Sequence, residues 1–153
     1  MSIQKLSLLS FSFLTILSIS LTSYCTLVFL DAYNVASEIE VEMCKVVIKD
    51  GSVTTTLRFK NPTKFMLRLG SVWEELYLNG WSNFVGEGFL WVPYWNSYKM
   101  PPYCEVFLNV TVTATYIPNL PSSGIWCAKI TFWVYDVPLI EWGARFVRFV
   151  KYS

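Results

Sequence analysis

The sequence predicts an all-β domain, a β-sandwich of about seven short strands, preceded by one N-terminal transmembrane helix. An uncharged apolar stretch occupies residues 6–30, and beyond it apolar and polar residues alternate at the period of a β-strand. Asp-Gly and Asn-Gly turn signals separate the alternating runs. The 153-residue chain therefore divides into a membrane anchor, residues 1–33, and a β-domain, residues 34–153.

The N-terminal stretch is long enough to span a bilayer as a helix. No charged residue occurs from Leu6 to Leu30, and at about 1.5 Å per residue the stretch exceeds the roughly 30 Å hydrocarbon core. Its Ser and Thr hydroxyls can bond carbonyls of the preceding turn. Several of them share one half of the helix: Ser7, Ser12, Thr15, Ser18, Thr22, Ser23 and Thr26. This face could pack against another membrane helix or protein, or its residues could simply be tolerated fillers.

Two processed forms compete with an uncleaved anchor. A cleaved signal peptide needs small residues before its cut, which Ser18 and Ser20 supply, but a further uncharged run follows them. A lipoprotein cut before Cys25 needs a small residue at position 24, where Tyr24 stands. The length of the stretch therefore favours an uncleaved anchor that holds the chain in the lipid bilayer through residues 6–30.

The charges that flank the anchor predict its direction. Lys5 precedes the apolar stretch, whereas Asp31 and several glutamates follow it before the first base, Lys45. By the positive-inside rule, the N-terminus lies in the cytoplasm and the β-domain lies outside. The expected localisation is a single-pass membrane protein with an extracytoplasmic domain.

The β-domain begins with a hairpin. Residues 39–49 and 53–60 flank Asp50-Gly51, and this pair suits a two-residue turn because both central positions need positive φ. In the register that the turn imposes, Cys44 lies opposite Leu57. We therefore expect the Cys44 side chain to be a small buried hydrophobe.

Further strands follow the same pattern. A second hairpin turn is expected at Asn79-Gly80, and Gly86 and Gly88 indicate a bulge or an edge strand. Asn109, which begins the only glycosylation sequon, is expected to face away from the core together with Thr111. The remaining strands are expected over residues 71–78, 84–92, 104–116, 125–135 and 144–151.

Composition argues against most catalytic and nucleic-acid functions. The chain has no histidine, which removes the commonest general base and metal ligand. The net charge is +1, so no strong field favours nucleic acid. Glu74 and Glu75 are adjacent in a strand and point to opposite faces, so they cannot act as a catalytic pair. The four cysteines form no C-x-x-C pair, and their spacing assigns no disulfide. We expect no enzyme activity, no catalytic residue, no cofactor and no metal site.

The segment from Trp81 to Tyr103 is unusually rich in aromatic residues. Such surfaces stack on sugars, bind proteins or lie at membrane interfaces. The simpler interpretation is that these side chains cap one open end of the sandwich. If they are exposed instead, they form a binding surface, for which the candidates are Trp81, Trp91, Tyr94, Trp95 and Tyr98.

A series of turn motifs occurs in a recognisable order. These are Asn61-Pro62-Thr63, a strand ending in Leu78-Asn79-Gly80, Gly86-Glu87-Gly88, Pro101-Pro102 before an alternating strand, and Val137-Pro138-Leu139 leading to Gly143. Over residues 39–151 this order resembles the water-stress and hypersensitive-response (WHy) domain of type 2 late-embryogenesis-abundant (LEA) proteins. The resemblance implies an immunoglobulin/fibronectin-like sandwich that often follows one membrane helix and serves in stress protection rather than catalysis. Each motif residue also has an explanation in turn chemistry, so we interpret these residues as fold markers.

Two functions remain on the basis of the sequence. The first is a non-enzymatic, membrane-tethered β-sandwich with a stress-protective or envelope-associated role. The alternative is a surface binding module whose aromatic loop, residues 81–103, engages a glycan, a lipid or a protein partner.

Overall fold

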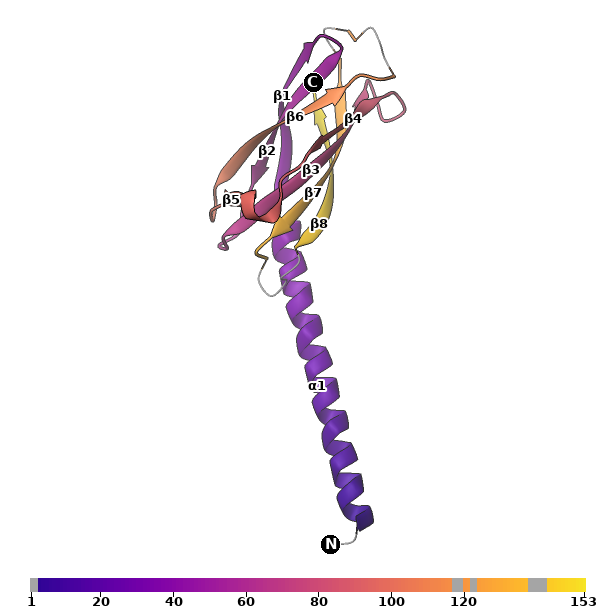
Figure 1. The fold of residues 1–153 in the computed structure, drawn as a ribbon, viewed down its shortest axis with the longest axis vertical. Helices are drawn as coiled ribbons and strands as arrows, with labels where there is room; N and C mark the ends of the chain where they lie inside the picture. Colours follow the sequence, from indigo (N-terminus) through magenta and orange to yellow (C-terminus); the bar gives the residue numbers. More distant parts are fainter. Residues whose placement is uncertain (1–2, 117–119, 122–123, 138–142) are drawn as a thin grey trace.

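The structure, a computed structural model, describes residues 3–116, 120–121, 124–137 and 143–153. Pro138 and Leu139 of the family pattern lie outside these ranges. Figure 1 shows one long helix that leads into a β-rich domain. The elements in chain order are α1 (Ile3–Ser37), β1 (Glu40–Lys49), β2 (Ser52–Lys60), β3 (Leu67–Leu78), β4 (Phe84–Leu90), the 3₁₀ turn η1 (Tyr94–Asn96), β5 (Tyr98–Met100), β6 (Glu105–Thr113), β7 (Trp126–Tyr135) and β8 (Ala144–Tyr152).

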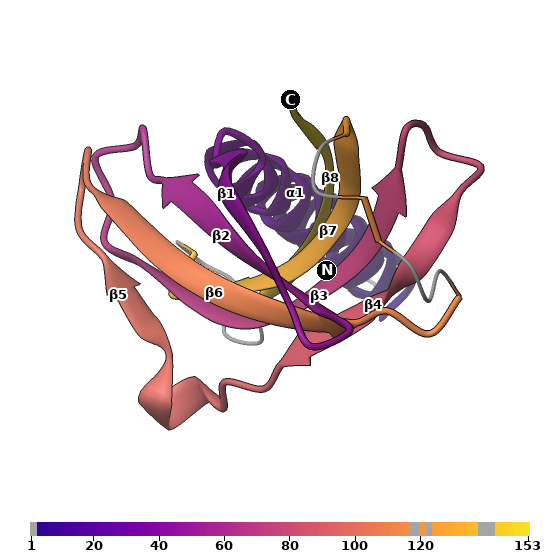
Figure 2. The ribbon, with the colours of Figure 1, turned by 90° about the horizontal axis from the view of Figure 1, so that it is seen from above.

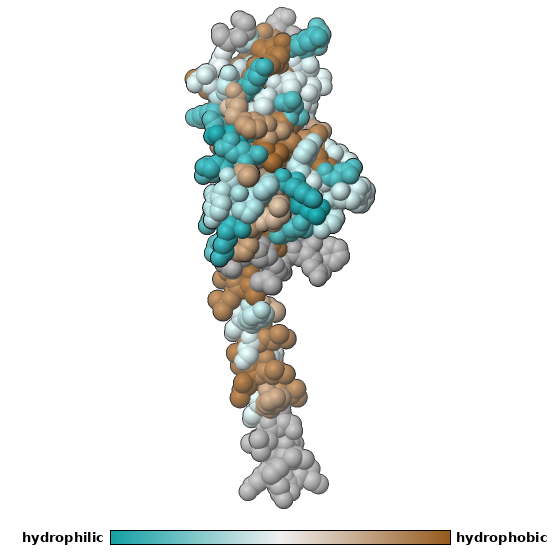
Figure 3. Space-filling model, turned by 90° about the vertical axis from the view of Figure 1, so that its left-hand side faces the viewer, coloured by the Kyte–Doolittle hydropathy of each residue, from teal (hydrophilic) through white to brown (hydrophobic). Residues whose placement is uncertain are grey.

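Helix α1 is longer than the expected membrane segment at both ends. Its stretch Phe11–Val35 is long and apolar enough to cross a membrane, judged by length and composition. The hydroxyls of Thr15, Thr22 and Thr26 donate to the carbonyl four residues earlier, which satisfies these polar groups within the helix. In Figure 3 the coloured part of the helix is mainly brown, whereas the visible face of the domain mixes teal, white and brown.

The last turn of α1 belongs to the β-domain. Val35 and Ile39 are buried in the domain core, and the Tyr33 ring packs on Phe146 of β8. The Arg148 guanidinium donates to the Ser37 carbonyl, which places a cation at the negative end of the helix. The expected division at residue 33 therefore falls inside a continuous helix, and the helix is fixed to the domain by packing.

Two antiparallel sheets face one another across a shared core (Figure 2). One sheet has the order β1-β2-β6, and the other has the order β4-β3-β7-β8 with β5 also paired to β3. Side chains of both sheets meet in one buried cluster, in which Phe59 of β2 contacts Phe132 of β7 edge to face. The described residues contain one strand more than the expected seven, because the short β5 pairs with the start of β3.

The register corrects the expectation for Cys44. A β-bulge between Met43 and Lys45 leaves Met43 opposite Leu57, and Cys44 is exposed. Met43 takes the buried place that the simple hairpin register assigns to Cys44. The hairpin turn is as expected, since Asp50 and Gly51 have φ values of 49° and 73°.

The two glycines of the Gly-x-Gly motif allow β4 to approach β6 closely. A Cβ atom on Gly86 would lie 2.2 Å from the Thr113 carbonyl oxygen, and one on Gly88 would lie 2.6 Å from the Thr111 carbonyl oxygen. The β4 strand is an edge strand, and its pairing with β3 shifts register between Leu76 and Tyr77. The expected edge and bulge are therefore present, and the close approach explains why glycine occupies both positions.

Replacing Gly86 with alanine is expected to lower the free energy of unfolding by about 3 kcal/mol, because the new methyl group meets backbone that cannot rotate away. Urea unfolding of the full chain in detergent micelles, followed by circular dichroism, measures the change. Gly51→Ala is the matched control, since no atom lies within 4 Å of its added Cβ and only the left-handed backbone costs about 1 kcal/mol. Equal losses in the two variants would contradict the close-approach explanation.

Candidate functional site

Three of the five expected surface aromatics come together at one end of the outer face of the five-stranded sheet. Trp91 is 70% exposed, Trp95 is 78% exposed and Tyr94 is 47% exposed. Tyr98, in β5 beside Leu69, is 39% exposed. These side chains form an exposed surface and do not cap the core.

Trp81 lies apart from this group. It follows the turn that joins β3 to β4, at the opposite end of these strands, and its ring packs on Tyr77 and Phe149. Its exposed fraction of 39% is half that of Trp95. The five predicted aromatics therefore divide into the group of Trp91, Tyr94 and Trp95, Tyr98 in β5, and Trp81 at the opposite end.

Hydrogen bonds to backbone groups hold the aromatic segment in place, one set from Ser71 of β3 and one within the segment. The Val92 N–H donates to the Ser71 hydroxyl at 3.0 Å, and that hydroxyl lies 3.2 Å from the Val92 carbonyl. Val92 itself is buried, directly after the exposed Trp91. The Ser97 hydroxyl and N–H both donate to the Tyr94 carbonyl, which closes the short turn η1.

An ion pair holds Tyr94. Its hydroxyl donates to Asp136 at 3.1 Å, and Asp136 pairs with the Arg68 Nε at 2.6 Å. The Tyr94 ring packs edge to face on Tyr135, with the Arg68 guanidinium 5.5 Å from the ring centre. Trp91 and Trp95 thus lie in a segment whose backbone and central tyrosine are held by hydrogen bonds.

Two shallow hollows continue the surface across the sheet. A hollow of about 350 Å³ is lined by the aromatic segment together with Trp133 and Tyr135 of β7. A second, of about 340 Å³, is lined by Trp73, Phe89 and the Glu87-Gly88 pair. Trp73 and Trp133 escape the sequence prediction. Each of the two lies between inward-facing residues of its strand, β3 or β7. Because neighbouring residues in a strand point to opposite faces, the alternation places both tryptophans on the outer face.

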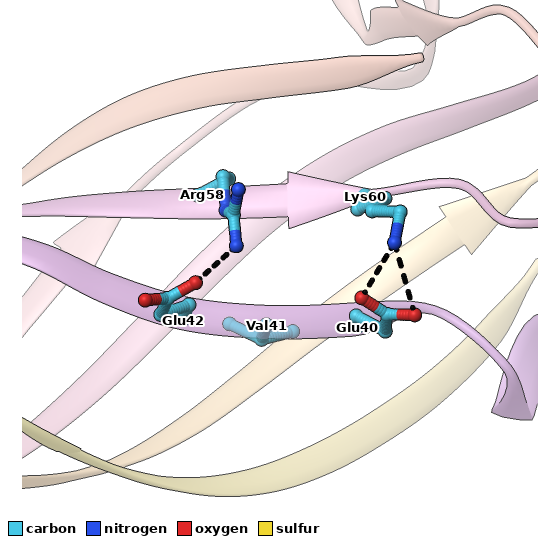
Figure 4. A pocket seen from close by; sticks show the side chains of 5 residues that line it. All are labelled: Glu40, Val41, Glu42, Arg58 and Lys60. Carbon is cyan, nitrogen blue, oxygen red and sulfur yellow. Dashed lines mark hydrogen bonds and ion pairs between the residues drawn. The ribbon is translucent and has the colours of Figure 1, made fainter. Parts of the chain in front are cut away.

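The outer face of the three-stranded sheet is mainly polar, although Val47 and Phe107 are exposed on it. Its small hollow, shown in Figure 4, is lined by the residues Glu40, Val41, Glu42, Arg58 and Lys60. Arg58 pairs with Glu42 and with Glu105, and Lys60 pairs with Glu40 at 3.0 Å. The hydrogen bond to Glu42 and the charge of Glu105 raise the pKa of Arg58. Because the charges are mutually neutralised, the hollow offers no strong attraction to an ion.

The candidate glycosylation site and the Asn-Pro motif lie where the sequence predicts. Asn109 is exposed on β6, and its side-chain oxygen accepts from Thr56 at 2.8 Å. Asn61 is fully buried just after β2. Its amide nitrogen donates to the carbonyls of Phe65, Met100 and Pro101, and its oxygen accepts the Thr63 N–H. Asn61 is therefore a satisfied turn residue that joins the β2–β3 connection to β5.

Glu74 is a buried group that the sequence analysis missed. It does point away from Glu75 as expected, but it points into the core, where it is fully buried. Its Oε2 accepts from the Thr55 hydroxyl of the opposite sheet at 2.5 Å, while Oε1 has no partner among the described residues. The signal was present in the sequence, because Glu74 shares its strand face with Val72 and Leu76.

Burial raises the pKa of Glu74 from its ordinary 4.5 to about 7, against the opposing effect of the Thr55 hydrogen bond. A protonated Glu74 can donate to Thr55, whose hydroxyl then lies 3.4 Å from the Val110 carbonyl. The neutral acid therefore completes a polar chain between the sheets. No group of three or more histidine, cysteine or acidic side chains that could hold a metal occurs in the part of the chain that the structure describes.

The folded chain holds the Glu74 proton more tightly than the unfolded chain. The contribution of Glu74 to the free energy of unfolding should therefore be fully present below pH 4.5 and should be lost as the pH rises through 7, a change of about 3 kcal/mol for this group. Glu74→Gln removes this decline and should stabilise the domain at pH 8. Urea unfolding between pH 4 and pH 8, in detergent micelles, measures both curves.

Glu75→Gln is the matched control for this prediction. Glu75 lies on the outer face, where it pairs with Lys129 at 2.6 Å and accepts from Tyr77. Its replacement should cost about 0–1 kcal/mol at neutral pH and should leave the Glu74 decline in place. A Glu74→Gln curve with the slope of the unchanged chain would contradict the assignment.

Comparison with known proteins identifies no family. No family model matches the chain, and no curated protein matches it. Among solved structures, the chain is similar to a protein from Archaeoglobus fulgidus, at 13% sequence identity and a TM-score of 0.45, over 76% of this chain and 97% of that one. A likeness at this level supports no argument about function.

Proposed function

We propose that the chain is a single-pass membrane protein whose non-enzymatic β-domain is held outside the cytoplasm, close to the bilayer. The observation that carries this proposal is the continuity of α1 with the domain. The apolar stretch Phe11–Val35 is continuous with the domain, because its last residue, Val35, is packed in the domain core. The proposal that the domain is not catalytic rests on a sequence without histidine.

We further propose that the domain is an immunoglobulin/fibronectin-like sandwich of the WHy/LEA type 2 kind, with a stress-protective or envelope-associated role. The strand orders β1-β2-β6 and β4-β3-β7-β8 support the sandwich. The buried Asn61 after β2, the positive φ of Asn79 and Gly80, and the close approach at Gly86 support the family, because each motif residue performs a structural task at its expected place.

Thiol labelling tests the membrane topology. Cys44 and Cys104 are exposed on the domain, and Cys127 is buried. In intact cells that express the full chain, a membrane-impermeant maleimide should label Cys44 and Cys104, because the domain faces the outside. Labelling measured by mass spectrometry should spare Cys127 until the chain is unfolded.

The control is the Cys44→Ser, Cys104→Ser double variant, which should lose the label in intact cells. Breaking the cells before labelling should not increase the signal of the unchanged chain. Labelling that appears only after the cells are broken would place the domain in the cytoplasm and overturn the proposed orientation.

The second candidate function is a surface binding module. The specific observation in its favour is the joint exposure of Trp91 and Trp95, at 70% and 78%. Large exposed apolar patches on small proteins mark interaction sites, and the ordered backbone behind these two side chains favours binding without rearrangement.

Alanine substitution distinguishes a binding surface from a structural cap. Replacing Trp91 and Trp95 together should change the free energy of unfolding by no more than about 0.5 kcal/mol, because both side chains lie mainly in water. Val92→Ala, between them and buried, should cost about 2 kcal/mol. Urea unfolding in micelles gives both values, and a double variant as unstable as Val92→Ala would show that the indoles are part of the core.

A further inference from the structure

We propose that Trp91 and Trp95 lie in the headgroup layer of the bilayer that α1 spans, so that the β-domain contacts the membrane through these two indoles as well as through the helix. This inference rests on the proposed single-pass topology and names the partner of the aromatic surface. The occupant is a phospholipid bilayer.

Strand register places the aromatic segment at the helix end of the domain. Glu40 follows the end of α1 closely and pairs with Lys60, which pairs with Glu105. In the other sheet, the helix contacts β8 near its beginning, at Phe146. The beginning of β8 pairs with the end of β7, and the end of β7 pairs with the beginning of β3. The beginning of β3 therefore lies at the same end of the domain as the helix.

The hollow under the aromatic segment lies at the same end. It is lined by Trp133 and Tyr135, from the last residues of β7, and β5 pairs with the first residues of β3. In Figure 1, β5 and the adjoining turn lie in the part of the domain nearest to α1. Figure 2 shows the connection between β4 and β5 projecting outward from the two layers. The most exposed indoles are thus carried by the segment that protrudes at the membrane end.

The length of helix between the hydrocarbon core and the β-domain fits this placement. The uncharged stretch ends at Leu30, before Asp31, and Ser37 lies seven positions further along the helix, which is a rise of about 10 Å. The headgroup layer on each side of a roughly 30 Å hydrocarbon core is about 5–8 Å thick. The packing of Val35, Ile39 and Tyr33 holds the domain against the helix end, so the base of the domain lies at the outer edge of the headgroups and its projecting side chains reach into the headgroup layer.

The chemistry of this end matches a phospholipid interface. Trp and Tyr concentrate at headgroup level, because an indole or phenol has an apolar body and a polar edge. Exposed bases lie at the same end: Lys64 on the β2–β3 connection, Lys99 in β5 and Arg145 at the start of β8. None of the three forms an ion pair among the described residues, and Lys64 and Arg145 lie over the rings of Phe65 and Trp133. Exposed bases in such positions attract lipid phosphates.

A distance-sensitive measurement on the full chain tests the inference. The chain is labelled with 5-fluorotryptophan, reconstituted in phospholipid nanodiscs, and examined by fluorine NMR with and without a gadolinium-chelating lipid headgroup. Each resonance is assigned by a single Trp→Phe substitution. Because paramagnetic broadening falls very steeply with distance, Trp91 and Trp95 should lose several-fold more intensity than Trp81, the exposed indole at the far end of the domain.

The outcomes separate this inference from the proposed topology. A chain that fails to co-purify with the discs overturns both. A chain that is incorporated, but whose Trp91 and Trp95 resonances broaden no more than that of Trp81, overturns the headgroup contact alone. The same absence of broadening together with cross-linked dimers in the discs assigns the surface to a second copy of the chain, and this result also overturns the inference.

A triple variant tests whether the three bases help to hold the indoles at the membrane. The triple substitution of Lys64, Lys99 and Arg145 by glutamine leaves both indoles in place but removes the charge that attracts phosphate. It should reduce the broadening of Trp91 and Trp95 in discs of anionic lipid and leave Trp81 unchanged. Identical broadening in the triple variant and the unchanged chain would overturn the role of the bases in the proposed contact.

Discussion

The burial of the last turn of α1 in the β-domain is the contact on which the placement of the whole molecule depends. Val35 and Ile39 enter the same core as the sheets, and Arg148 binds the carbonyl of Ser37 at the helix end. A helix that ended in a flexible linker would leave the domain free to turn in any direction. Here the packing gives the domain one orientation relative to the helix.

The two sheets then present different outer faces to their surroundings. The three-stranded sheet carries threonines and paired charges, of which Thr54 with Thr111 and Arg58 with Glu42 are examples. The five-stranded sheet carries exposed aromatic rings, from Trp73 and Phe89 to Trp91. Between the faces, Glu74 places an acid in the core at a cost that grows with pH. The five-stranded sheet therefore exposes more aromatic surface than the three-stranded sheet.

Much of the fold could be predicted because its signals are local. The Asp50-Gly51 and Asn79-Gly80 turns need positive φ, and alternation along β2 and β6 places their residues correctly. The sequence predictions fail where a bulge shifts the strand register or where a strand forms only by pairing with a distant segment. The bulge beside Met43 moves Cys44 from the core to the surface, and β5 exists because its residues meet the start of β3, far away in the sequence.

The sequence by itself determined an uncharged apolar stretch, a β-domain with fixed turns, and a segment rich in aromatic residues, because composition, period and turn chemistry are properties of neighbouring residues. Only the tertiary structure decided which side chains are in water. Trp91 and Trp95 are exposed because Val92, between them, is held by Ser71, and Glu74 is buried because β2 covers it. These outcomes depend on contacts between distant segments, which no local pattern specifies.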